Sequence, residues 1–175
     1  MNMNAAFDEH FMKMALREAL KAADEGEVPL GAVIVAPAVL EPAHDGHPAV
    51  FDWNPTTAKI IGRSHNMPEG LKDATAHAEM LAMSAAFQAV GDWRLTGARL
   101  YVTKEPCPMC AGAIVLARLD AVVWGVSDPK RGGGTTFGIF EHPGINHHPA
   151  VVTGVCEAES KAILQDFFRE RRKMV

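Results

Sequence analysis

Apolar residues recur at helical spacing in some stretches of the chain and run continuously in others. Between Asp8 and Gly26, positions 11, 14, 15, 20 and 22 are apolar, which predicts a helix capped by Asp8 and ended by Gly26. The same reasoning predicts further helices over 75–90, 108–118 and 160–173. Apolar runs predict strands at 29–35, 59–63, 99–103, 121–125 and 151–155.

Short strands that alternate with helices predict an α/β protein with a mixed sheet covered on both faces. Residues 37–58 interrupt this alternation with four prolines and no periodicity, so we expect a surface loop between two strands. The length of 175 residues fits one domain spanning 1–175, with 37–58 as a loop insertion. The three tryptophans, Trp53, Trp93 and Trp124, are expected to pack rather than to stack on a ligand.

Composition narrows the classes of partner. The chain has no stretch of 18 apolar residues, so we expect no membrane contact. Only three cysteines are present, Cys107, Cys110 and Cys156, which argues against a disulfide framework and for a cytoplasmic protein. The formal net charge is −4, so an RNA partner would have to meet a local basic patch.

Candidate metal ligands fall at the predicted starts of two helices. His77 lies near the start of one, and Cys107 and Cys110 lie at the start of another. Both helix starts are expected at the carboxyl ends of strands, where open α/β sheets place their sites. A helix N-terminus lowers the pKa of a thiol, and two thiolates with one imidazole bind Zn²⁺ while leaving a fourth position for water.

Glu79 follows His77 by two residues and is expected to move protons between that water and a substrate. The order His-x-Glu, then Pro-Cys-x-x-Cys, is a general signature of nucleobase deaminases, tRNA deaminases among them. A Cys-x-x-Cys pair alone also suits a redox pair or half of a zinc ribbon. No thioredoxin-like context surrounds it, and only Cys156 remains as a further thiol.

With these motifs the sequence resembles the cytidine and deoxycytidylate deaminase superfamily and, within it, the bacterial tRNA-specific adenosine deaminases. The resemblance is carried by segments 26–33, 73–79, 100–113, 128–130, 146–147 and 166–172. It implies a three-layer α/β/α cytidine-deaminase-like fold with a mixed five-stranded sheet, and a homodimer with one Zn²⁺ per subunit. It also implies conversion of adenosine to inosine at the wobble position of a tRNA anticodon stem-loop.

The residues expected to contact the substrate lie outside the zinc motifs or beside them. Asn66 is implied to hold the flipped base, and the backbone amide near Ala78 to position the base or the attacking water. Arg171 and Arg172 either meet phosphates or form a solvated basic helix end. The full set of expected substrate contacts is Asn66, Ala78, Asp128, Lys130, Asn146, Phe168, Arg171 and Arg172.

The chain departs from the family pattern at Ala74, where proline is usual, and at Lys104, where leucine is usual. Residues 37–58 are longer than typical members carry, and the glycine run 132–134 is looser. Two alternatives share the zinc signature: a deaminase of a free guanine- or cytosine-type base or nucleoside, and a non-catalytic zinc-binding subunit that presents RNA. The segments 128–130 and 167–168 disfavour the first, and Glu79 disfavours the second.

Overall fold

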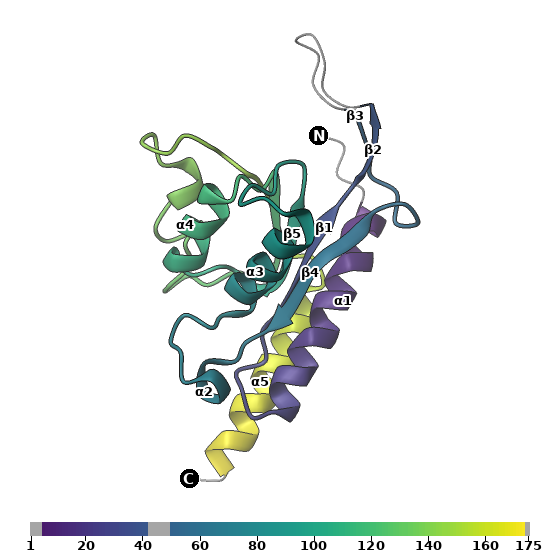
Figure 1. Ribbon diagram of the computed structural model, residues 1–175. Helices are drawn as coiled ribbons and strands as arrows, with labels where there is room; N and C mark the ends of the chain where they lie inside the picture. The colour runs from purple at the N-terminus through teal and green to yellow at the C-terminus, as the bar shows by residue number, and fades with distance from the viewer. Residues whose placement is uncertain (1–4, 42–49, 174–175) are drawn as a thin grey trace.

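The computed structural model describes residues 5–41 and 50–173, without the side chains of 40 and 41. A five-stranded sheet has the order β4-β1-β5-β6-β7. Figure 1 labels its first three strands, β4, β1 and β5. β1 is antiparallel to β4 and β5, whereas β5, β6 and β7 are parallel, so the sheet is mixed as expected. The strands are β1 Gly31–Ala36, β4 Lys59–His65, β5 Arg99–Lys104, β6 Ala121–Val126 and β7 Ala150–Thr153.

Helices cover both faces of this sheet. The helices are α1 Ala5–Asp24, α2 Pro68–Leu71, α3 Ala78–Val90, α4 Pro108–Leu116 and α5 Glu157–Lys173, with a short 3₁₀ helix at Ile139–Glu141. α1 and α5 lie side by side over one face, and α3 and α4 lie over the other (Figure 1). Two glycines let helices pack closely on the strands. A Cβ at Gly31 of β1 would lie 2.1 Å from the Ala15 carbonyl oxygen of α1, and a Cβ at Gly62 of β4 would lie 2.2 Å from the Ala82 carbonyl oxygen of α3. The expected three-layer α/β/α fold is confirmed.

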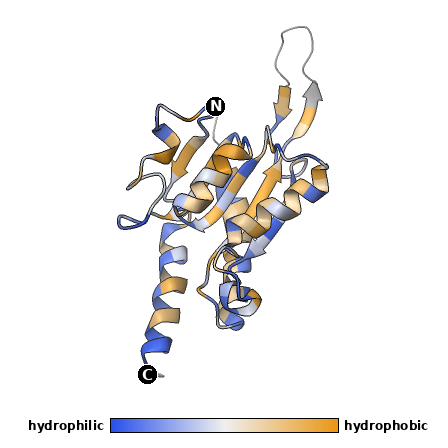
Figure 2. Cartoon of the chain, turned by 60° about the vertical axis from the view of Figure 1, so that its left-hand side comes forward, coloured by the Kyte–Doolittle hydropathy of each residue, from blue (hydrophilic) through white to orange (hydrophobic). Residues whose placement is uncertain are grey.

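The core is divided between the two faces by the alternation of strand residues. Ile34 and Leu100 point toward α3 and α4, whereas Val33 and Tyr101 point toward α1. All four of these side chains are fully buried from solvent. Figure 2 shows hydrophobic residues on the strands and hydrophilic residues at the C-terminal end of α5.

The first helix begins earlier than its sequence pattern suggests, and the expected cap at Asp8 is wrong. α1 starts at Ala5, so Asp8 lies inside its first turns. The Asp8 side chain is buried and accepts a 2.8 Å hydrogen bond from the Tyr101 hydroxyl. Tertiary pairing with a strand, and not helix capping, therefore accounts for this acid.

The segment 37–58 is not the plain surface loop that we expected. β2 Ala38–Glu41 and β3 Val50–Asp52 pair antiparallel and form a separate two-stranded sheet at the end of β1 (Figure 1). Residues 42–49 lie outside the described part of the chain. Trp53, directly after β3, packs edge-on against Phe7 with ring centroids 5.6 Å apart.

Other boundaries differ by a few residues. α3 begins at Ala78 and not at 75, because His77 is extended with φ −74° and ψ 152°. α4 ends at Leu116, and Arg118 then takes a left-handed φ of 61°. The packing roles expected for Trp53 and Trp124 are confirmed, but the one expected for Trp93 is wrong, since that side chain is 57% exposed. Among the described residues, no helix is long and apolar enough to cross a membrane.

Candidate metal centre and active site

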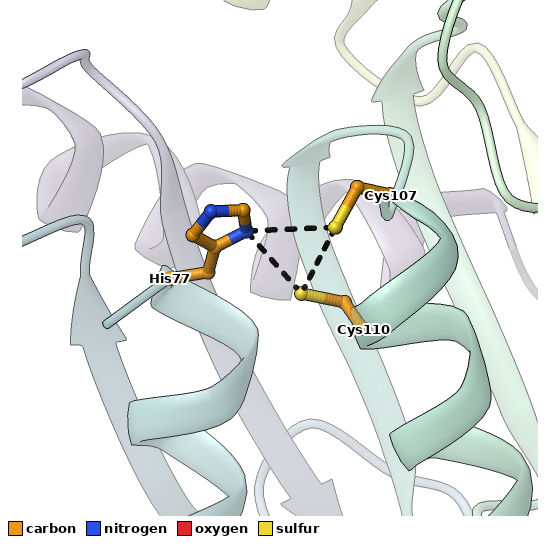
Figure 3. A group of neighbouring side chains, drawn as sticks. All are labelled: His77, Cys107 and Cys110. Carbon is orange, nitrogen blue, oxygen red and sulfur yellow. Dashed lines mark hydrogen bonds between the residues drawn. The ribbon is translucent and has the colours of Figure 1, made fainter. Parts of the chain in front are cut away.

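Two helix starts bring the candidate metal ligands together. α4 follows β5 after a three-residue turn, and Cys107 is its N-cap. His77 is the N-cap of α3, which packs beside α4 on the same face of the sheet. Figure 3 shows the imidazole of His77 facing the sulfurs of Cys107 and Cys110, with Nδ1 toward both. The predicted cluster is therefore present.

The three ligand atoms form a nearly equilateral triangle. His77 Nδ1 lies 3.6 Å from Cys107 Sγ and 3.5 Å from Cys110 Sγ, and the two sulfurs are 3.7 Å apart. Tetrahedral zinc ligands, with sulfur at about 2.3 Å and nitrogen at about 2.0 Å from the ion, lie about 3.5–3.8 Å from one another. These residues therefore fit a zinc ion, and as three protein ligands they leave a fourth position open. No other such group occurs in the described part of the chain.

Of the two thiols, Cys107 favours its charged thiolate form and Cys110 does not. The hydrogen bond between the two thiols, together with the one to His77, lowers the pKa of Cys107 to about 3. The same hydrogen bond and burial raise the pKa of Cys110, and the bond with Cys107 raises the pKa of His77. A divalent cation among the three would favour the thiolate form of both sulfurs, since metal ligands bind deprotonated.

Glu79 is buried beside this triangle, in the first turn of α3. Burial raises the pKa of its carboxyl group, with opposing contributions from its own backbone N–H and from His77. Its Oε2 has no hydrogen-bond partner among the described residues. A buried acid with an unused oxygen and a raised pKa is the arrangement that proton transfer requires.

Asn66 lies at the same helix start and is almost fully buried. Its Oδ1 accepts a hydrogen bond of 3.2 Å from the backbone N–H of Ala78. The amide that we expected to face the base or the water is therefore engaged by Asn66. Its own backbone N–H donates to the Leu30 carbonyl at 3.0 Å, which ties it to the chain before β1.

Asp128 stabilises its own loop. Its Oδ1 accepts from the backbone N–H groups of Lys130 and Arg131 at 3.0 and 3.1 Å. Its Oδ2 pairs with the Lys104 ammonium, which holds the pKa of Asp128 below its usual range. The side chains of Lys130 and Arg131 are exposed on the same loop. Of these, only the two cations are available to a partner.

Asn146 lies away from the metal ligands. Its side-chain and backbone oxygens accept from Arg118 Nη1 at 2.6 and 3.0 Å. Arg118 follows the C-terminal end of α4, whereas Cys107 caps the opposite end, about 15 Å away along a helix of this length. Within one chain the structure does not bring Asn146 to the candidate zinc site.

The basic end of the last helix lies at the same end of the sheet as Asn66. α5 starts at the carboxyl end of β6, where a Cβ at Gly125 would lie 2.4 Å from Ser160 Oγ. The C-terminal end of α5 and Gly26, in the turn after α1, line one groove. Leu30, four residues after Gly26, accepts the hydrogen bond from the Asn66 backbone N–H, so the groove and Asn66 lie at the same end of the sheet. Phe168 is 43% exposed, and Arg172 makes no ion pair with any described residue.

Glu105 belongs to the site but was not singled out from the sequence. It lies two residues before Cys107, is 3% exposed, and accepts three hydrogen bonds from the loop that carries Asp128. The only signal in the sequence was an acid two residues before the first cysteine of the motif.

Comparison with known proteins agrees with this geometry. The pattern of the family described as the cytidine and deoxycytidylate deaminase zinc-binding region matches residues 5–126. A tRNA-specific adenosine deaminase of Bacillus subtilis (strain 168) is 46% identical over 95% of this chain and 91% of its own length. One of Agrobacterium fabrum (strain C58 / ATCC 33970) is 44% identical over 93% of this chain and 95% of its own.

A solved structure has a similar fold. It comes from a study of A-to-I editing by tRNA:A34 deaminases at the wobble position of transfer RNA, and is 41% identical with a TM-score of 0.73. The match covers 89% of this chain and 99% of that one. The likeness therefore extends over nearly the whole of both molecules, and not over the zinc motifs alone.

Proposed function

This chain belongs to the cytidine and deoxycytidylate deaminase family, and from that premise we propose that it hydrolyses adenosine to inosine at the wobble position of a tRNA anticodon stem-loop. The observation that carries the proposal is the triangle of His77, Cys107 and Cys110 with the buried acid Glu79 beside it. Relatives named for this activity match almost from end to end, which favours it over deamination of a free base.

Zinc, when bound, lowers the pKa of a water molecule to about 7 and so supplies the nucleophile for attack on C6 of adenine. Glu79 accepts a proton from that water and delivers it to ring N1, which makes C6 more electrophilic. Glu79 then takes the remaining proton of the hydroxyl now bonded to C6 and passes it to the departing amine. The C6 carbonyl of inosine forms as the C6–N bond breaks and ammonia leaves. General acid–base help of this kind contributes about 10²–10⁴ in rate.

Asn66 is proposed to hold the base. The target nucleotide has to leave the stack to reach a buried acid, and an unpaired loop base loses less stacking than a duplex base. The bond from Ala78 to Oδ1 fixes the orientation of the Asn66 carboxamide. Its NH₂ end is then the part that donates to the base.

Lys130 and the basic end of α5 are proposed to meet the phosphates. Lys130 is exposed on the loop beside the start of α4, and Arg171 and Arg172 extend α5 on the Asn66 side. Phe168 is proposed to contact the RNA from the same helix. The net charge of −4 makes these local cations necessary, because bulk attraction is absent. A steep loss of stem-loop affinity with salt, blunted in an Arg171→Ala, Arg172→Ala double variant, is the expected result.

We further propose a homodimer that acts on tRNA in the cytoplasm. α4 contains no charged residue, yet Leu116 on its outer face is 72% exposed and Gly112 on that face meets no atom within 4 Å. A helix that is apolar all round is normally buried, so a second copy is the expected cover. Light scattering should give twice the chain mass, and Leu116→Glu should return the protein to a monomer.

The direct test is to incubate zinc-loaded protein with an anticodon stem-loop that carries adenosine at the wobble position. Digestion and chromatography should reveal inosine, and a stem-loop with guanosine at that position should remain unchanged. Adenosine, guanine and cytidine are supplied separately as free substrates, with ammonia release as the readout. Turnover of a free base with no inosine in the RNA would overturn the proposal.

A further inference from the structure

The mechanism above leaves one buried carboxylate beside the metal ligands unused. Glu105 lies in the turn between β5 and α4, and its side chain points to residues 127–138, which we call the glycine loop. Oε2 accepts from the backbone N–H of Asp128 at 2.7 Å and from the Thr135 hydroxyl at 2.9 Å. Oε1 accepts from the backbone N–H of Thr135 at 2.7 Å. Both oxygens are therefore bonded to this one loop.

Glycine is required where the loop meets this carboxylate. A Cβ at Gly132 would lie 2.2 Å from Glu105 Oε1, and one at Gly133 would lie 2.6 Å from the Ala111 side chain. The Gly133 Cβ would also lie 3.0 Å from the Cys107 carbonyl oxygen. The glycine loop thus lies directly against the first turn of the helix that supplies two zinc ligands.

The glycines do not form an anion cradle. The backbone N–H groups of Lys130 and Arg131 donate to Asp128 Oδ1, and that of Gly132 donates to the Asp128 carbonyl at 2.9 Å. The Gly133 N–H donates to the Pro106 carbonyl at 2.8 Å. Phosphate-binding glycine loops work through free backbone N–H groups, whereas those of residues 130–133 are engaged here. The loop offers an anionic partner its two exposed cations instead.

We infer that Glu105 is a positioning residue for RNA: it locks the glycine loop onto the Cys107 turn, so that Lys130 and Arg131 stand at a fixed place relative to the metal. Through this carboxylate the RNA-facing cations and the zinc ligands are parts of one rigid unit. The inference rests on the proposed function, because it takes the anticodon stem-loop as the partner of these cations. It adds a residue that itself touches neither RNA nor zinc.

The test uses Glu105→Gln, which keeps the size of the side chain but places an NH₂ group against an N–H or O–H donor. Loss of such a bond to a buried charged acceptor is expected to weaken binding about tenfold. The dissociation constant of a fluorescent anticodon stem-loop and the KM should therefore both rise about tenfold. The kcat should stay within about twofold of wild type, and zinc should remain at one per chain.

Two further variants alter the hydrogen bonds of Glu105 from the side of the glycine loop. Thr135→Val removes the hydroxyl donor from an exposed position, which should preserve the fold and raise the dissociation constant by a smaller factor. Gly132→Ala pushes a methyl group against Oε1 and should reproduce the Glu105→Gln phenotype. Combining Glu105→Gln with Thr135→Val should add less than the product of the two single effects, because both act on one contact.

Asp120→Asn is the matched control. Asp120 likewise accepts a loop N–H, from Gly97 at 2.8 Å, but at the opposite end of β5 and β6. It should leave the dissociation constant and KM unchanged.

Loss of zinc or a fall in kcat in Glu105→Gln, with unchanged RNA affinity, would show that Glu105 only supports the metal turn and would overturn the inference. The proposed function fails in a distinct way, with wild-type protein that neither binds the stem-loop nor forms inosine.

Discussion

Two buried acids lie at opposite ends of the sheet and have opposite surroundings. Glu79 is 4% exposed at the start of α3, and Asp8 is 2% exposed beneath the first residues of β5. Burial is the main cause that raises the pKa of each. Asp8 is bonded to Tyr101 and lies 3.9 Å from Arg99 Nη1, whereas Glu79 Oε2 has no partner among the described residues.

The difference separates a structural acid, Asp8, from Glu79, the acid proposed to carry protons. Asp8 has partners that offset part of the cost of its burial, so it contributes to a fixed network. Glu79 keeps an oxygen without a hydrogen-bond partner beside three metal ligands. A buried group left unpaired costs stability, and groups of this kind cluster at functional sites. Burial and a raised pKa are shared by both acids in this protein, so the unpaired oxygen beside the metal ligands is what supports the proposed role of Glu79.

The β2–β3 hairpin belongs to the structural end. Trp53 lies over the Arg99 guanidinium, whose carbon is 3.6 Å from the ring centroid. Arg99 is 1% exposed and also faces the Phe7 ring at 5.7 Å. The hairpin is therefore anchored at the start of β5, away from the metal ligands that follow the end of this strand. We expect changes there to alter stability and not chemistry.

The largest expected effect removes the metal. Cys110→Ala leaves two of three ligands, so the protein should lose zinc, inosine formation should fall below detection, and the melting temperature should drop because zinc binds the folded state. Metal analysis of the purified variant gives the zinc content. Cys156→Ala is the control, since this third cysteine lies outside the ligand cluster and should keep one zinc per chain. Full zinc in Cys110→Ala would refute the ligand assignment.

The next effect separates chemistry from metal binding. Glu79→Gln preserves the shape of the side chain but removes the proton carrier, so kcat should fall by about 10²–10⁴ while zinc content is retained. Its melting temperature should equal or exceed that of wild type, because an unpaired buried acid is replaced by a neutral group. Kinetics with the stem-loop measures kcat, metal analysis measures the zinc content, and calorimetry measures the melting temperature. A variant with wild-type kcat would exclude Glu79 from the reaction.

The zinc site could be predicted because its signal is local. Cys107 and Cys110 share one helical turn, and His77 and Glu79 flank the start of another, so spacing alone placed all four at helix N-termini. Continuous apolar runs likewise predicted β5 and β6 within one residue of their observed ends. Both strands are covered on two faces, which produces an unbroken apolar pattern.

Contacts between distant segments escaped prediction. Asp8 has the residue type of a helix cap, but its partner Tyr101 lies 93 positions away. Glu105 meets Asp128 and Thr135, which are 23 and 30 positions downstream. The residues of β2 and β3 lie in a proline-rich stretch where apolar and polar positions alternate only weakly. The pairing of the two strands depends on a register that this local pattern does not give. Nothing in the local pattern of these residues specifies such partners.

A moderate effect is expected at the hairpin anchor. Trp53→Ala removes the ring that covers Arg99 and Phe7, which should lower the free energy of unfolding by about 2–4 kcal/mol. Zinc content and kcat/KM should change by less than about twofold. Urea unfolding measures the loss, and Trp53→Phe should recover much of it because a ring is retained. A large fall in kcat/KM at full folding would mean that the two ends of the sheet are coupled.

The smallest effect concerns the pH dependence of stability. Burial raises the folded-state pKa of Asp8 above its unfolded value of about 3.9. Between these two pKa values the folded protein binds more protons than the unfolded chain, so this group's contribution to stability declines as pH rises and is constant above the folded pKa. Asp8→Asn does not titrate. Its free energy of unfolding relative to wild type should therefore increase as pH is raised from about 4, and then level off.

Asp128→Asn gives the opposite sign and so controls for general effects of pH. Lys104 holds the folded-state pKa of Asp128 below its unfolded value, so its contribution is present above the unfolded pKa and is lost as pH falls. The deficit of Asp128→Asn relative to wild type should therefore shrink in acid. Urea titrations at matched pH values measure both trends. Equal slopes for the two variants would contradict the assignment of Asp8 as an acid whose burial outweighs its pairing with Arg99.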